Sequence, residues 1–442
     1  MSNPIEALQS LKLRPFLAGL RAESVVFWLL CFYILLEYLR PQAMYPFLDI
    51  LPWGQVAILA CVTGVFITQN KAIGFGAMDA MFIAFSLLVI ISGVFAWNPA
   101  ESLEEWTTYA SWVLMYFCIV SILTTPNRIF LFALFFVLIN FKLSQHGARV
   151  FAMRGFSFAS YGLSGSPGWF HNSGELALQM VVMFAMSLSI LLAFREYVKK
   201  KIRWWVLMLL FPGTAALTVI GSSSRGGQLA LVAVLLIILL KGGQLFKKVL
   251  FISIVFYLGL HILPEEQIAR FNTMGDDGTS ELRLMHWEHA MDTLDHNPLG
   301  IGYRNWPAYY EAIYNPEKVE QIHNTVLEVF VDLGYPGGIL FLIMLLTAFA
   351  MNAKTKREMH AVEGVEGTSI AAIATGINLG LIGTIIAAFF MSVLFYPMFW
   401  VAFALTSALR HISRSKVTLH KKTPSTIRNK AALNEQGEQS CG

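Results

Sequence analysis

The sequence predicts an all-α integral membrane protein with about twelve transmembrane helices. Of its 442 residues, 56% are hydrophobic and only 14% are charged, and the mean hydropathy is +0.59. A soluble domain usually contains about 25% charged residues, so these values exclude the class of soluble globular proteins. The apolar residues also occur in blocks, and a helix that crosses a bilayer needs ~20 of them. Because backbone polar groups in lipid must pair with each other, we expect each block to be a helix.

Twelve apolar blocks are predicted to span the membrane. The run at 231–240 does not alternate between apolar and polar residues, which disfavours membrane strands. The blocks lie near residues 25–39, 53–69, 78–97, 106–123, 128–144, 173–194, 204–221, 226–240, 249–263, 324–351, 368–394 and 395–409.

The distribution of Lys and Arg predicts the orientation. With the N-terminus in the cytoplasm, most of the 32 basic residues fall in cytoplasmic segments, above all in 195–203, 241–248, 354–357 and the tail from residue 410. This is the positive-inside bias of multi-pass membrane proteins. The net charge of +4 therefore reflects the cytoplasmic surface, and no nucleic-acid partner is expected.

The predicted organisation has three parts. These are a cytoplasmic segment 1–24, a polytopic membrane domain 25–411, and a polar, disordered cytoplasmic tail 412–442. Within the membrane domain, the periplasmic loop 264–322 is too long for a passive connector and is expected to be functional. Ser280 is predicted to cap a short helix in this loop that ends near Leu294.

A turn rich in glycine and serine, Gly221 to Gly227, lies at the outer face. Its glycines allow a ligand to approach the backbone, and the helix that begins near Gly226 would direct N–H groups towards an anion. Arg225 adds a guanidinium that can bind phosphate through two hydrogen bonds. The alternative is a tight turn with a snorkelling arginine.

Two further arginines belong to the outer loop. Arg283 lies in the predicted loop helix, and Arg304 follows the turn 297–302. Each alone is consistent with a solvated surface charge. Three arginines on one membrane face that otherwise has few charges favour a shared anionic ligand.

His323 directly precedes the apolar block at 324–351 and is a candidate general base. The pKa of histidine, ordinarily ~6.5, suits proton transfer near neutrality. The alternative is a histidine that only decorates the membrane interface. Asn324 follows it, and Glu328 and Asp332 lie in the first turns of the helix, where a charge usually faces a partner or a cavity.

A second polar cluster ends the outer segment before the block at 173–194. Asn172 or Ser173 can cap that helix, with Glu175 in its first turn, and His171 is a second candidate base.

The histidines of the outer loop are candidate metal ligands. His286, Glu288, His289 and His296 lie close together. They do not follow the His-Glu-x-x-His pattern of zinc sites, so no metal and no other cofactor is expected.

Four stretches resemble the O-antigen ligase family, which includes O-antigen polymerases and bacterial protein O-oligosaccharyltransferases. Residues 222–227 are similar to its arginine–glycine motif, and Arg283 and Trp287 followed by 296–302 resemble its outer-loop motif. A third stretch is similar to its histidine-led helix: His323 and Asn324 with Leu327, Asp332, Gly334 and Gly337. Residues 170–177 resemble a His-Pro-Asn element of the family but lack the proline. The resemblance covers about residues 165–350.

The resemblance implies a glycosyltransferase of the bacterial inner membrane that uses neither metal nor nucleotide. Such an enzyme moves a glycan at the periplasmic face from an undecaprenyl-diphosphate carrier to a hydroxyl of lipid A-core, another glycan or a protein. Arg225 and Arg283 would hold the diphosphate, and His323 would position or deprotonate the acceptor. We add Arg304 to the anion site from its place in the sequence.

Other residues are candidates for supporting roles. The candidates around the reaction are His171, Asn172, Glu175, Asn324, Glu328 and Asp332. The candidate aromatic faces for sugars are Trp169, Trp287, Tyr303, Trp306 and Tyr309, although aromatic belts are equally normal at a membrane surface.

Three alternatives to a ligase remain open from the sequence. A polymerase and a protein O-oligosaccharyltransferase of the same family differ from it in the acceptor. A transporter of lipid-linked glycan belongs to another class and would show inverted repeats and helices broken at the midplane. The sequence shows no such repeat.

Overall fold

The structure is a computed structural model that describes residues 4–10, 12–68, 74–157, 162–198, 202–240, 278–316, 318–362 and 364–439. Every regular element in these ranges is a helix, as predicted. The first half contains α1 (Pro4–Gln9), α2 (Leu13–Arg21), α3 (Val25–Leu39), α4 (Pro41–Met44), η1 (Pro46–Leu48), α5 (Trp53–Thr68), α6 (Ala77–Val94), α7 (Pro99–Ile122) and α8 (Pro126–Met153). The second half contains α9 (Ser173–Val198), α10 (Ile202–Gly221), α11 (Arg225–Leu240), α14 (Gly278–His296), α15 (Trp306–Tyr314), α16 (Thr325–His360), α17 (Val365–Ala388) and α18 (Pro397–Gln439).

Within the described ranges, seven helices are long and apolar enough to cross a bilayer. They are Val25–Met44, α6, α8, the part of α9 from Ser173 to Arg195, α10, α16 and α17. The helices α5 and α11 are apolar but shorter. The chain is therefore an all-α, multi-pass membrane protein. The count of twelve spans stays a prediction, and the predicted span at 249–263 lies outside the described residues.

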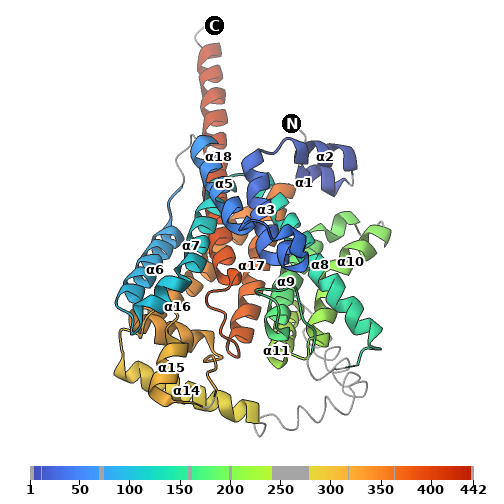
Figure 1. The fold of residues 1–442 in the computed structure, drawn as a ribbon. Helices are drawn as coiled ribbons and strands as arrows, with labels where there is room; N and C mark the ends of the chain where they lie inside the picture. Colours follow the sequence, from blue (N-terminus) through green and yellow to red (C-terminus); the bar gives the residue numbers. More distant parts are fainter. Residues whose placement is uncertain are drawn as a thin grey trace.

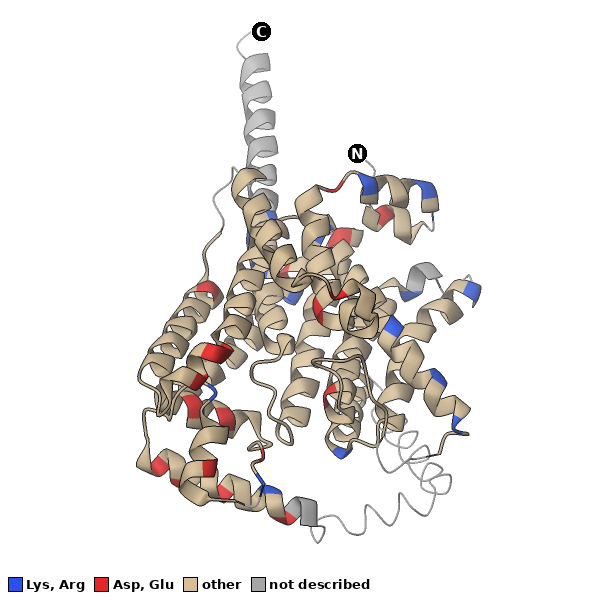
Figure 2. Ribbon diagram, viewed as in Figure 1, with Lys and Arg blue, Asp and Glu red and all other residues tan. Residues whose placement is uncertain are grey.

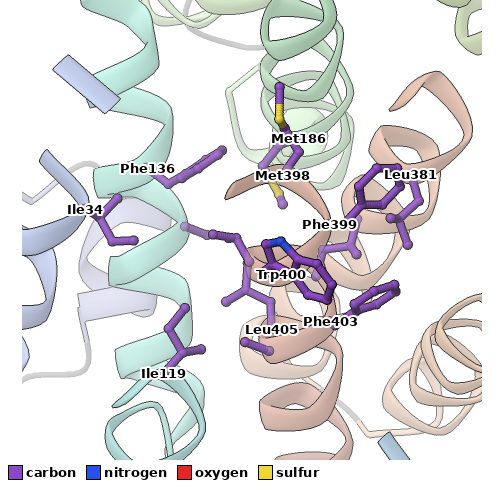
Figure 3. Packing of buried hydrophobic residues seen from close by; sticks show 14 of the residues in the cluster. Ile34, Ile119, Phe136, Met186, Leu381, Met398, Phe399, Trp400, Phe403 and Leu405 are labelled. Carbon is purple, nitrogen blue, oxygen red and sulfur yellow. The ribbon is translucent and has the colours of Figure 1, made fainter. Parts of the chain in front are cut away.

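The first turns of α18 form the centre of the bundle. Phe399, Trp400 and Phe403 are at most 1% exposed, and Figure 3 shows them among apolar side chains of α3, α7, α8, α9 and α17. Membrane helices associate mainly through van der Waals packing, because lipid tails are as apolar as leucine. The packing around α18 therefore holds the two halves of the chain together.

Small residues bring α9 and α17 close to each other. A Cβ atom built on Gly376 would lie 2.9 Å from the sulfur of Met186, and one on Gly383 would clash with Cγ1 of Val181. Small residues at such contacts are characteristic of tightly packed membrane helices. This packing fixes α9, whose first turn lines the site described below.

The bundle has two distinct faces. We call "lower face" the one formed by residues 95–98, 222–224, 278–324 and 389–396, which lies towards the bottom of Figure 1. There the N–H of Trp97 donates a hydrogen bond of 2.8 Å to the carbonyl of Ile301. Both termini lie towards the opposite face (Figure 1). This arrangement agrees with a cytoplasmic location for both ends, which remains a prediction.

The structure corrects the boundaries of α14 and of the two helices α17 and α18. α14 begins at Gly278, so Ser280 lies inside the helix rather than at its cap, and the helix ends at His296 rather than Leu294. α17 ends at Ala388 and α18 begins at Pro397, so residues 389–396 are a connection where two adjoining spans were predicted. That connection is mostly apolar, and hydropathy alone does not distinguish an apolar loop from a helix.

The tail also differs from expectation in its backbone. α18 continues as a helix to Gln439 and projects away from the bundle (Figure 1), whereas residues 412–442 were predicted to be disordered. An isolated polar helix is only marginally stable in water. Disorder of this tail in solution therefore stays a prediction.

Candidate functional site

A cavity of about 920 Å³ lies at the lower face. Its wall combines α7, the start of α9, the start of α11, α14, the segment before α16 and the connection between α17 and α18. The lining residues are Glu105, Thr108, Trp169, Asn172, Ser173, Gly174, Glu175, Ser223, Ser224, Arg225, Gly226, Arg283, Arg304, Gln321, His323, Phe390, Met391, Ser392, Phe395 and Tyr396.

The four residues assigned to the reaction from the sequence all line this cavity. They are Arg225, Arg283, Arg304 and His323. In Figure 2 the ribbon of α14 and α15 contains several acidic residues, so the face around these arginines has more charge than we expected from the sequence. The cavity is thus a cationic pocket within that face.

Three helices begin at the cavity, and two of them have side-chain caps. Ser224 Oγ accepts a hydrogen bond from the N–H of Gly227 (3.3 Å) at the start of α11. Asn324 Oδ1 accepts hydrogen bonds from the N–H groups of Val326 and Leu327 (3.0 and 3.2 Å) at the start of α16. The third helix, α9, begins at Ser173. Helix N-termini carry partial positive charge and bind anions, so they add to the field of the arginines.

Arg304 is held at both its side chain and its backbone. Its Nη2 lies 3.4 Å from Oε2 of Glu105, and its N–H donates a hydrogen bond of 3.0 Å to Oδ2 of Asp332. The guanidinium also lies over the ring of Phe395, 6.0 Å from the ring centroid. Arg304 therefore reaches the cavity in a fixed position.

A kink in α16 positions the turn that carries Arg304. Gly334 has φ 66° and ψ −173°, which interrupts the helix. Three backbone hydrogen bonds of 2.9 to 3.0 Å join the turn to the kink: Ile301 N to Val331 O, Gly302 N to Asp332 O, and Tyr335 N to Pro298 O. The turn 297–302 and the first part of α16 are thus one packed unit.

His323 lies directly before the cap of α16. Its N–H donates a hydrogen bond of 3.1 Å to Ser392 Oγ, and its Nε2 lies 3.8 Å from Oε2 of Glu320. Burial, and after it the positive charge of Arg283, lower the pKa of this imidazole below its usual value. A histidine with a lowered pKa is neutral at pH 7 and can accept a proton.

Three residues of the cavity wall other than glycine adopt a left-handed backbone. Ser223, Arg304 and His323 have φ values of 58°, 61° and 55°. Residues other than glycine rarely adopt this backbone conformation, and those that do are concentrated at functional sites.

Glu328 and Asp332 support the wall from behind and do not line the cavity. They are 4% and 1% exposed. Glu328 Oε2 accepts a hydrogen bond from the N–H of Leu394 (3.4 Å), while Asp332 holds Arg304. Their contacts assign them to holding the loops in place.

Some of the polar residues around the start of α9 line the cavity, and others face away from it. Asn172 and Glu175 line the cavity, whereas His171 is exposed and is not part of its wall. The structure therefore offers no support for His171 as a base. Asn172 Nδ2 donates to Oε1 of Glu175 (3.2 Å), so this side chain braces the carboxylate. Ser173, the other predicted cap residue, is the first residue of α9.

Of the five aromatic residues predicted to stack on sugars, one lines the cavity and the others are packing residues. Trp169 lines the cavity, but Tyr303, Trp306 and Tyr309 are at most 9% exposed and belong to the packed interior. Trp287 packs against that interior. Four of the five predicted sugar-stacking faces are therefore packing residues, because an aromatic side chain at a membrane surface is as often structural.

The sequence did not point to several wall residues. Glu105 and Thr108 of α7 come from a segment that was interpreted as a generic span. Phe390, Met391, Ser392, Phe395 and Tyr396 come from the unpredicted connection between α17 and α18. The polar residues Ser392 and Tyr396, next to Pro397 within an apolar run, were the signals in the sequence that could have indicated this connection.

Comparison with known families relates two regions of the chain to described families. Residues 206–342 match the family model described as O-antigen ligase. This region belongs to the O-antigen ligase family. Residues 14–154 match a second model, of a family of unknown function. No curated protein matches the chain.

The O-antigen ligase region supplies the cationic side of the cavity. Arg225, Arg283, Arg304 and His323 all fall within the matched residues. Glu105 falls in the second matched family, and Glu175 and Tyr396 fall in neither. The O-antigen ligase motifs are therefore completed by a wall that lies outside them.

Proposed function

We propose that the chain is a membrane glycan transferase of the O-antigen ligase type. It moves a glycan from an undecaprenyl-diphosphate carrier to an acceptor hydroxyl, with the cavity facing the periplasm of a bacterial inner membrane. The observation that carries the proposal is the convergence of Arg225, Arg283, Arg304 and His323 on one cavity. The acceptor is lipid A-core in a ligase, a lipid-linked glycan in a polymerase, and a side-chain hydroxyl in a protein glycosylation enzyme.

The arginines and helix N-termini account for activation of the donor. As the bond between the anomeric carbon and the diphosphate oxygen breaks, negative charge grows on the diphosphate. Donors that are already oriented towards this charge stabilise the transition state without reorganisation. The bidentate geometry of Arg225 and Arg283 suits phosphate oxygens.

His323 accounts for activation of the acceptor. Its neutral imidazole takes the proton of the acceptor hydroxyl while the acceptor oxygen forms the new bond to the anomeric carbon. The carrier leaves as undecaprenyl diphosphate. Attack opposite to the leaving group inverts the anomeric carbon.

Deletion of the gene tests this function when surface polysaccharide is examined by gel electrophoresis. A ligase predicts loss of all long attached chains and accumulation of carrier-linked polymer, whereas a polymerase predicts an acceptor with a single repeat unit. An unchanged polysaccharide, with no glycoprotein lost, would contradict the proposal.

Arginine variants connect the loss to the cavity. Arg225→Ala or Arg283→Ala in the complementing gene should lower transfer by tens- to thousands-fold, because removing one partner of a buried charge contact costs ~2–5 kcal/mol. Lysine should restore only part of the rate, since it lacks the planar fork. Arg149→Ala, an exposed arginine of α8, is the matched control and should complement fully. We expect a smaller loss for Arg304→Ala.

A further inference from the structure

The cavity has a second side that is chemically different from its arginines. Two carboxylates line it, and one of these, Glu105, pairs with Arg304. The other, Glu175, has no ion pair among the described residues. An unneutralised carboxylate repels a diphosphate, so Glu175 suits a neutral ligand rich in hydroxyl groups.

The Glu175 carboxylate is braced on one oxygen. Oε1 accepts hydrogen bonds from Asn172 Nδ2 (3.2 Å) and from the hydroxyl of Tyr396 (3.3 Å). Oε2 is buried and has no hydrogen-bond partner within the described part of the chain. A carboxylate has about four acceptor positions, and a buried acceptor without a partner is costly. This side chain therefore retains capacity to accept a hydrogen bond from a ligand.

Tyr396 keeps the proton that it donates to Glu175. Burial, and after it the neighbouring Glu175 carboxylate, raise the pKa of the phenol well above its usual value. The Tyr396 hydroxyl therefore remains a donor at every physiological pH. It orients the carboxylate without neutralising it.

Trp169 forms a rigid apolar surface beside this pair. Its Nε1 donates a hydrogen bond of 3.0 Å to Oε2 of Glu37, and its ring centroid lies 5.1 Å from the guanidinium carbon of Arg40. The ring of Tyr396 meets it edge to face, 5.0 Å between centroids. A fixed aromatic ring next to a hydrogen-bond acceptor matches a sugar, which has apolar C–H faces and hydroxyl edges.

We propose that Glu175, Tyr396 and Trp169 form the binding subsite for a carbohydrate acceptor. The carboxylate of Glu175 accepts a hydrogen bond from a hydroxyl of the acceptor, and the sugar ring of the acceptor packs against Trp169. The donor diphosphate lies on the arginine side of the same cavity, so the two substrates enter opposite electrostatic environments. This assignment rests on the proposed transferase function.

The test separates the two substrates kinetically. Purified protein is assayed with donor from an organic extract of the deletion strain and with lipopolysaccharide of that strain as acceptor. Glu175→Gln should raise the KM for the acceptor by about 10- to 100-fold, the effect of weakening a hydrogen bond to a charged group, and leave the KM for the donor unchanged. Tyr396→Phe should act in the same direction with a smaller change.

The controls keep the outcomes distinct. Glu101→Gln changes an exposed carboxylate at the start of α7, outside the cavity wall, and should leave both KM values unchanged. Size-exclusion chromatography and thermal unfolding confirm folding, and Tyr396→Phe carries the test if Glu175→Gln does not fold. An unchanged acceptor KM, or a rise confined to the donor KM, overturns the subsite. A wild-type protein that transfers glycan neither to this lipopolysaccharide nor to a second molecule of the carrier-linked donor instead overturns the function on which the subsite rests.

Discussion

Individual residues of the cavity wall are fixed in position before any substrate binds. A left-handed backbone at a residue other than glycine costs roughly 1–3 kcal/mol. Arg304 and His323 keep it because Asp332 and Ser392 accept hydrogen bonds from their N–H groups. The free energy of folding thus holds the guanidinium and the imidazole at the cavity, where the proposed reaction requires them.

The pH dependence of transfer should follow His323. Its lowered pKa keeps the imidazole neutral through pH 7, so the rate should be flat near neutrality and fall only below the usual ~6.5, as the base becomes protonated. His323→Gln should lower the turnover by roughly 10²–10⁴-fold, as is typical for a general base. Rates measured at saturating donor and acceptor provide the test.

Glu320 offers a sharper check of the same residue. Its carboxylate raises the pKa of His323, so Glu320→Gln should move the acidic limb of the rate profile to lower pH. Glu288→Gln, an exposed carboxylate of α14, should leave the limb in place. A limb that does not move, together with an active His323→Gln variant, would show that the proton goes elsewhere.

The sequence was informative about residues whose charge is unusual for their surroundings. Arg225 and His323 are polar groups at the outer edge of apolar blocks, where a charge usually faces a partner or a cavity, and Arg283 belongs to the long loop on the same predicted face. Glu105 is one of three glutamates in the first turns of α7, and one sequence does not show which of them faces inward. The role of Tyr396 depends on a contact with Glu175 that only the fold creates.

At the scale of elements, the kink in α16 connects the helix that follows His323 to the turn that carries Arg304. The φ and ψ angles of Gly334 lie in a region that is essentially restricted to glycine. A Cβ atom there would lie 2.5 Å from Cα of Leu299 and 2.6 Å from the carbonyl oxygen of Pro298. The long apolar block of this helix was predictable, but the kink was not, because glycine and proline also occur within straight membrane helices.

Gly334→Ala should therefore damage both stability and activity. We expect roughly 1–3 kcal/mol of backbone strain, increased by the clash with the turn that carries Arg304. The melting temperature in detergent should fall and transfer should weaken. Gly213→Ala in α10 has no neighbour within 4 Å and should leave both unchanged. Equal melting temperatures for the two variants would contradict the role of the kink.

On the scale of the whole molecule, the two faces of the bundle define the topology. Periplasmic placement of the lower face predicts a periplasmic signal from a reporter fused within 270–320. Reporters fused after Arg203 and after Lys356 should give cytoplasmic signals, because basic segments are retained inside. A periplasmic signal after Arg203 would overturn the orientation.

The wall of the cavity begins at Glu105 and ends at Tyr396, which has a consequence for biosynthesis. A polypeptide emerges from the ribosome in order, and Tyr396 is made after every other wall residue. A nascent chain that already displays Arg225, Arg283 and His323 still lacks the residues that brace Glu175 and His323, namely Tyr396 and Ser392. The wall of the pocket is therefore complete only after Tyr396 has been synthesised. Under the proposed function, a prematurely terminated chain would lack the finished site and could not transfer glycan from the carrier.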